Sequence, residues 1–302
     1  MTAADQELSF EMLVERRRKS TRMNIGHPMA HSFKSLLGIA LQDWNSDESW
    51  QAIAELQMRG SPESLAIASR FAKCRNWRKR ALGLYVASQL CRSPKKWETI
   101  GRAEYALWET QAMLLAGLRD DCVEVVRAAI SGFAHRPHKS ALPNLIGFAS
   151  HPDQQIRLQV AITLGSYIEV ESIDALLRLA TDISDDVRNW ATFSIGSMHR
   201  ADNPNIRDLL WRNLQDRDEN VRGEAVVGLA IRKDERVASV LLELLDIDCG
   251  VFELNAAERM ASPLLLDRLN ALKKSVNDKD TIDSYWYRHL LDAIVACSRT
   301  KM

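Results

Sequence analysis

The chain has 302 residues, 46% of them hydrophobic, with 40 basic and 40 acidic side chains. The net charge of zero excludes the strong attraction to nucleic acid or anionic membranes that a basic domain shows. Five scattered cysteines without a C-x-x-C pair predict reduced thiols rather than disulfides or a zinc site. The first residues, MTAADQELSFEML, are polar and unlike a signal peptide, and the apolar patch SLLGIAL is far shorter than the roughly 20 residues of a membrane helix. We therefore expect a cytoplasmic protein without a membrane partner.

The first part of the chain predicts an extension followed by irregular repeats. Residues 1–46 predict a helical, partly flexible N-terminal extension. Its basic run ERRRKSTR, from Glu15 to Arg22, is typical of the solvated face of a leading helix, although it could instead contact a phosphate backbone or an acidic partner. Residues 47–117 predict diverged repeats, with NWRKRALGLYVASQL around Arg78 as one copy.

A clear internal repeat follows. Its four copies are DCVEVVRAAISGFA from Asp121, HPDQQIRLQVAITLG from His151, DISDDVRNWATFSIG from Asp182 and DRDENVRGEAVVGLA from Asp216. Their arginines, Arg127, Arg157, Arg188 and Arg222, are 30, 31 and 34 residues apart. A fifth copy from Asp246 keeps this spacing but has Phe252 in place of the arginine.

Each repeat predicts two helices joined by a turn. Amphipathic segments such as SIDALLRLA lie between the copies, and Asp153, Ser184 and Asp218 stand three residues before a buried apolar position, where an N-cap belongs. No stretch alternates with period two, so we expect no strands. The predicted fold is an all-α, right-handed α-α superhelix of about six to seven helix pairs. Regular repeats cover 118–275, and a capping helix lies within 276–302.

This pattern resembles HEAT repeats, particularly the short bacterial kind also seen in phycobilisome lyases. The resemblance implies that the turn aspartate and the arginine six residues later form a ladder of hydrogen bonds from repeat to repeat. Arg188 is then structural rather than a substrate-binding group. We expect an imperfect ladder at His151 and Phe252. The ladder residues are Asp121, Arg127, Arg157, Asp182, Arg188, Asp216 and Arg222.

The aromatic residues beside Arg188 are candidates for partner binding. The helix that begins near Ser184 buries Val187, Ala191 and Ile195 at helical spacing, which leaves Trp190 on its flank and Phe193 facing away from the core. Trp190 could instead fill the groove between adjacent helices. The residues that we expect to bind a protein partner on the concave face are Trp190, Phe193, Glu224 and Arg200.

No catalytic motif is visible in the sequence. The histidine pairs His27/His31 and His135/His138 lack the further ligands of a zinc site, and no His-Glu dipeptide, P-loop or G-x-S-x-G occurs. We therefore expect no catalytic residue, no cofactor and no metal.

A closer resemblance extends over roughly residues 50–275. The segments DVRNWATF, NPNIRD, DENVRGEA and RKDERV are similar to those of the enterobacterial YibA-like HEAT proteins. Members of that group are encoded beside Rhs-type polymorphic toxins and are suspected immunity proteins. The resemblance thus implies a non-enzymatic protein-binding module, an immunity protein whose partner is a toxin domain.

Two alternatives stay open. The first is a bilin-binding enzyme like the phycobilisome lyases. The second is a nucleic-acid-binding HEAT-like protein, which the 22 basic against 27 acidic residues of 121–302 disfavour.

Overall fold

The computed structural model describes residues 31–44, 46–92, 103–275 and 284–299. The basic run from Glu15 to Arg22 and most of the expected extension lie outside the described residues. The chain divides after Arg136 into two compact units, residues 1–136 (unit 1) and residues 137–302 (unit 2). No helix in the described ranges is both long and apolar enough to cross a membrane.

Unit 1 consists of three helix pairs. In each pair the second helix packs against the second helix of the neighbouring pair, so that α3, α5 and α7 lie in a row. Several of these helices begin at hydrogen-bonding N-caps, as at Ser46, Ser61 and Asn76. The helices are α2 Phe33–Gln42, α3 Asp47–Gln57, α4 Pro62–Ala72, α5 Trp77–Ser88, α6 Leu107–Gly117 and α7 Val123–His135.

A short β-ladder in unit 1 departs from the expectation of no strands. β1 Cys91–Arg92 pairs antiparallel with β2 Ala103–Glu104. Two residues per strand are too few to produce a visible alternation in the sequence.

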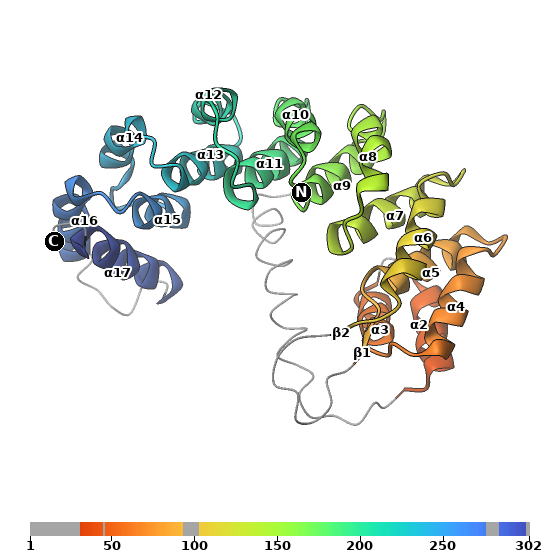
Figure 1. Cartoon of the computed structure of the whole chain (residues 1–302). Helices are drawn as coiled ribbons and strands as arrows, with labels where there is room; N and C mark the ends of the chain where they lie inside the picture. The colour runs from red at the N-terminus through yellow and green to blue at the C-terminus, as the bar shows by residue number, and fades with distance from the viewer. Residues whose placement is uncertain (1–30, 45, 93–102, 276–283, 300–302) are drawn as a thin grey trace. The chain divides into compact units, whose positions relative to one another are not determined.

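Unit 2 contains five helix pairs in two rows (Figure 1). The first-helix row is α8 Leu142–Phe148, α10 Val170–Leu179, α12 Pro204–Asn213, α14 Arg236–Leu244 and α16 Leu266–Ser275. The second-helix row is α9 Gln154–Leu164, α11 Asp185–Phe193, α13 Glu219–Ile231, α15 Val251–Met260 and α17 Ser284–Arg299. Within unit 2 the second-helix row lies on the inner side of the curve that the repeats follow (Figure 1).

The helices of unit 2 follow from caps and apolar spacing. The side chains of Asp153 and Asp218 cap α9 and α13, as expected, whereas Ser184 stands at the N-cap of α11 without a side-chain hydrogen bond. Val187 and Ala191 of α11 are fully buried. The prediction of an all-α fold is confirmed, with eight helix pairs in the described part of the chain. Two of them lie at the ends: α2 pairs with α3, and α17 packs on α15 and α16 as a further second helix.

The longest repeat contains an irregular turn. After α11 the backbone continues as a π-helical turn, Ser194–Met198, before the loop that leads to α12. Helix α13 crosses this turn at Gly228, so closely that a Cβ atom added at Gly228 would lie 2.7 Å from the Gly196 Cα. Glycine at both positions therefore lets α13 approach the turn.

Candidate functional site

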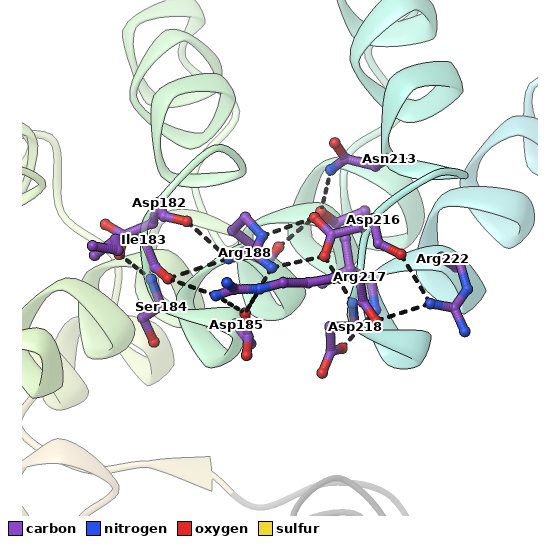
Figure 2. Close-up of polar contacts among 12 residues, drawn as sticks. Asp182, Ile183, Ser184, Asp185, Arg188, Asn213, Asp216, Arg217, Asp218 and Arg222 are labelled. Carbon is purple, nitrogen blue, oxygen red and sulfur yellow. Dashed lines mark hydrogen bonds and ion pairs between the residues drawn. The ribbon is translucent and has the colours of Figure 1, made fainter.

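The repeat arginines of α9 and α11 each join two consecutive repeats. Nε and Nη2 of Arg157 donate to the Asp182 carboxylate at 2.7 and 2.9 Å, and those of Arg188 donate to Asp216 at 2.8 and 2.7 Å. The third nitrogen, Nη1, donates to carbonyls of the turn that precedes the arginine's own helix, such as the Asp182 carbonyl at 3.0 Å from Arg188. Each arginine thus links its own turn to the next one, as Figure 2 shows for Arg188.

Arg188 has the most extensive set of these bonds. Besides Asp216, it donates to Asp185 at 2.7 Å, and the Asp185 carboxylate also accepts from Arg217 of the next repeat at 2.6 Å (Figure 2). The Arg188 side chain is only 9% exposed. Its guanidinium therefore fills all its donor directions inside the stack and is not available to a ligand.

Electrostatics show that these pairs are favourable. Burial opposes ionisation of Asp182 and Asp216, but the hydrogen bonds from Arg157 and Arg188 and from backbone N–H groups outweigh burial, so the pKa of both carboxyls is lowered. The hydrogen bond to Asp216 raises the pKa of Arg188 further. Both partners are therefore charged at neutral pH.

The ladder ends at α13. Arg222 is exposed and donates only to the Asp216 and Arg217 carbonyls of its own turn, with no carboxylate bond in the described part of the chain. The next repeat has Phe252 at the corresponding place, and its ring lies against Gly223, where a Cβ would be only 2.3 Å from the ring. Aromatic packing on a glycine thus takes the place of the ion pair.

The expected pair Asp121/Arg127 is wrong. Asp120, not Asp121, accepts the backbone N–H two residues ahead, as Asp182 and Asp216 do, so the alignment was displaced by one residue. Six residues after Asp120 stands a valine, and Arg127 instead bonds Glu124 on its own helix. Asp120 receives two bonds of 2.8 Å from Arg80, so Arg80 rather than Arg78 is the ladder arginine of α5. Asp121 also takes part in the ladder, because it accepts a further bond from Arg80 at 2.9 Å.

A second row of inter-repeat bonds lies at the opposite ends of the second helices. Arg232, which is 7% exposed, donates to five backbone carbonyls, those of Ile195, Gly196, His199, Ala201 and Gly228. All but the last belong to the π-helical turn and the loop after it, so Arg232 satisfies the carbonyls that this irregular backbone leaves unpaired.

Equivalent positions in other repeats act similarly, and the sequence analysis missed them. Arg136 donates to the Ser88 and Leu90 carbonyls, and His199 donates from Nε2 to the Leu164 carbonyl at 3.3 Å. A side chain that can donate a hydrogen bond recurs 16 residues after the turn, as Arg136, Tyr167 and Arg232. This recurrence was the signal in the sequence that could have indicated the second row. Because their acceptors are backbone carbonyls, no partner residue type marks them.

Two of the predicted partner-binding residues form an aromatic pair on α11. The rings of Trp190 and Phe193 lie edge to face, with centroids 5.6 Å apart and planes at 88°. Both side chains are half-buried, so each is partly packed and partly accessible. Arg200, beyond the π-helical turn, is exposed. Partner binding by these residues stays a prediction.

The fourth predicted residue, Glu224, is buried rather than displayed. It is 6% exposed, and burial raises the pKa of its carboxyl to about 8. The carboxyl is therefore largely protonated at neutral pH.

The first-helix row carries a different feature, a shallow hollow of about 530 Å³ between α10 and α12. It is lined by Leu177, Asn205, Asp208, Leu209, Trp211 and Arg212. The Arg236 guanidinium lies 4.7 Å from the Trp211 ring centroid.

The described residues contain no cluster of three or more His, Cys, Asp or Glu side chains that could hold a metal ion. Burial raises the pKa of Cys249 to about 12 and that of Cys297 to about 11, so both thiols are protonated at neutral pH.

Comparison with known proteins identifies the repeats. HEAT repeats match residues 112–196 and 184–261. Protein YibA of Escherichia coli strain K12 is 29% identical over 251 residues, which cover 81% of this chain and 86% of YibA. The chain is therefore a HEAT-repeat protein related to YibA.

Solved structures agree with this relationship. The X-ray structure of E. coli YibA is similar with a TM-score of 0.64 and 25% identity, covering 96% of this chain and 97% of that one. Yeast importin-β, Kap95p, has a TM-score of 0.59 at 14% identity, covering 96% of this chain and 43% of that one, which shows the fold alone. The predicted repeat superhelix is thus confirmed.

Proposed function

We propose that this chain is a non-enzymatic HEAT-repeat module that binds a protein partner across the second-helix row of unit 2. The observation that carries the proposal is the half-buried, edge-to-face pair of Trp190 and Phe193 on α11. Aromatic side chains held rigid by packing, yet partly accessible, are typical anchors of protein interfaces.

The internal bonding of the stack supports this surface. Because the ladder and the Arg232 bonds hold adjacent repeats together, the second-helix row presents fixed side chains that lose little conformational entropy on binding. The side chains whose pKa is shifted have structural or binding explanations rather than catalytic ones. Burial keeps the Cys249 and Cys297 thiols protonated, and burial lowers the pKa of His199, whose ring bonds the Leu164 carbonyl.

The finer proposal is that the partner is the toxin domain of an Rhs-type polymorphic toxin and that the protein acts as its immunity protein in the cytoplasm. This proposal rests on the resemblance to the YibA-like proteins over most of the chain. An immunity protein needs no chemistry of its own, since tight binding over the toxin's active surface is sufficient for inhibition.

The test is co-expression with the C-terminal domain of an Rhs-type toxin from the organism that encodes this chain. We expect the wild type to restore growth and to bind the purified domain, Trp190→Ala to bind it at least tenfold more weakly, and Trp211→Ala to bind it normally. Trp211 is a matched control because it is a half-buried tryptophan on the first-helix row.

Three results would count against the proposal. Equal loss of binding in both tryptophan variants would remove the second-helix row as the binding surface. Failure of the wild type to bind or protect would remove the toxin as partner. An absorbance shift on adding bilin, abolished by unfolding, would contradict the non-enzymatic, cofactor-free role.

A further inference from the structure

Two glycines show which faces of α11 and α13 meet. Gly196 and Gly228 are in contact, and a Cβ at Gly196 would also lie 3.3 Å from the Glu224 carbonyl oxygen. Glu224 precedes Gly228 by one helical turn, and Asn189 precedes Gly196 by seven residues, or about two turns. Residues so spaced share a helix face. Asn189 and Glu224 therefore stand on the facing sides of α11 and α13.

Both residues bring a hydrogen-bond acceptor that nothing in the described chain satisfies. The Asn189 Oδ1 atom is buried without a partner. Glu224 as a residue is only 6% exposed, and its carboxyl forms no hydrogen bond or ion pair with any described residue. Burial of unsatisfied acceptors is costly and rare in folded proteins. A buried amide oxygen and a buried glutamate that both lack a partner, on the facing sides of α11 and α13, indicate a site for a hydrogen-bond donor from another molecule.

The surroundings of Glu224 favour a positively charged donor. The charged or titratable groups at this interface, among them Arg188, His199, Arg232, Asp185, Asp216 and Arg217, do not shift its pKa. Charged groups of α12, α14 and α15 do not shift it either, because burial is its only cause. Arg188 and Arg232 are occupied by the bonds described above. No internal cation therefore neutralises this carboxyl.

We propose that Glu224 and Asn189 receive one lysine or arginine side chain of the protein partner, with Phe193 beside it. This inference rests on the proposed protein-binding function and names the partner's chemistry at the same surface. Phe193 follows Asn189 by four residues and is half-buried, so it shares the face of α11 that carries Asn189, where an aromatic ring can contact a cation or its aliphatic stem.

Binding of the cation is coupled to a proton. The Glu224 carboxylic acid gives up its O–H proton to solvent, and the resulting carboxylate accepts N–H bonds from the incoming side chain. Because the free carboxyl has a pKa of about 8, the affinity for the cation falls about tenfold per pH unit below pH 8. A neutral donor would show no such dependence.

The experiment uses N-acetyl-argininamide as the probe and N-acetyl-citrullinamide as its neutral isostere. The full chain, labelled with ¹³C at the glutamate carboxyls, is titrated with each compound at pH 6, 7 and 8, and the Glu224 signal is assigned by its loss in Glu224→Gln. We expect saturable binding of the arginine compound, strongest at pH 8, and little binding of the citrulline compound. Glu224→Gln should abolish binding, whereas Glu219→Gln, an exposed glutamate in the first turn of α13, should not change it.

The inference is overturned if the two compounds bind alike, if Glu224→Gln binds the arginine compound with wild-type affinity, or if no binding occurs at about 10 mM, which corresponds to less than about 3 kcal/mol. These results leave the proposed function standing if the toxin domain still binds and Trp190→Ala still weakens it. If the toxin domain does not bind but the arginine compound still does, the proposed function fails and this inference stands.

Discussion

Replacement of Arg188 by alanine tests the structural role of the ladder. The substitution removes two bonds to Asp216, one to Asp185 and those to the Asp182 turn, and it leaves the Asp216 carboxylate, 12% exposed, with only backbone donors. Removing one member of a buried pair costs about 3–5 kcal/mol. Because this pair is only partly buried, we expect a loss of about 2–4 kcal/mol in the free energy of unfolding.

Arg222→Ala is the matched control. Arg222 occupies the same position in the next repeat but is exposed and donates only to two carbonyls of its own turn. Its loss should cost less than about 1 kcal/mol. Arg188→Lys, which keeps the charge but not the planar two-donor geometry, should fall between the two.

Urea denaturation followed by circular dichroism at 222 nm, together with hydrogen exchange of the α11 and α13 amides, provides the measurement. The reasoning requires a large loss for Arg188→Ala that coincides with faster exchange in both helices. If Arg188→Ala and Arg222→Ala differ by less than about 0.5 kcal/mol, the inter-repeat ion pairs do not stabilise the stack.

Three further substitutions have defined outcomes. Glu224→Gln should stabilise the protein relative to the wild type, increasingly so as the pH rises from about 5 to 8. The reason is that the Glu224 pKa is about 8 in the folded state against 4.5 for a free glutamate, which lowers wild-type stability by at most about 3 kcal/mol at pH 7. Denaturation at a series of pH values checks this, and a difference that does not depend on pH contradicts it. Arg232→Met should cost more than about 3 kcal/mol because it removes the donor to five backbone carbonyls, four of them buried, with faster exchange at 194–201. Slow exchange there would refute the role of Arg232. Gly228→Ala should lower stability by about 1–3 kcal/mol because the added Cβ clashes with Gly196. Gly147→Ala, which adds a Cβ in open space, should be neutral or slightly stabilising. Thermal melts that show the reverse order would contradict the close crossing.

The apolar spacing of the repeats was sufficient to predict the helices and their buried faces. Val187, Ala191 and Ile195 were expected in the core, and all three are fully buried. Asp182, Arg188 and Asp216 could be recognised because charged pairs recur with the repeat. The displaced pair at Asp121 shows the limit: only Asp121 stands six residues before an arginine, yet Asp120 holds the turn position, because it accepts the Cys122 N–H and two bonds from Arg80.

The burial of Glu224 could not be predicted from helical spacing alone. A projection of α13 places Glu224 on the flank, where a glutamate normally reaches solvent. The close crossing at Gly196 and Gly228 brings α11 and α13 together, and beside this crossing Glu224 is only 6% exposed. The carbonyl-binding role of Arg232 was likewise hidden, because the π-helical turn that supplies its acceptors has no recognisable sequence pattern.

The most direct measurement of the central proposal is hydrogen exchange of the full chain with and without the toxin domain. Partner binding across the second-helix row predicts new protection in α11 and α13, around Trp190 and Glu224, with α10 and α12 unchanged. Protection confined to α10 and α12, around the hollow beside Trp211, would contradict it.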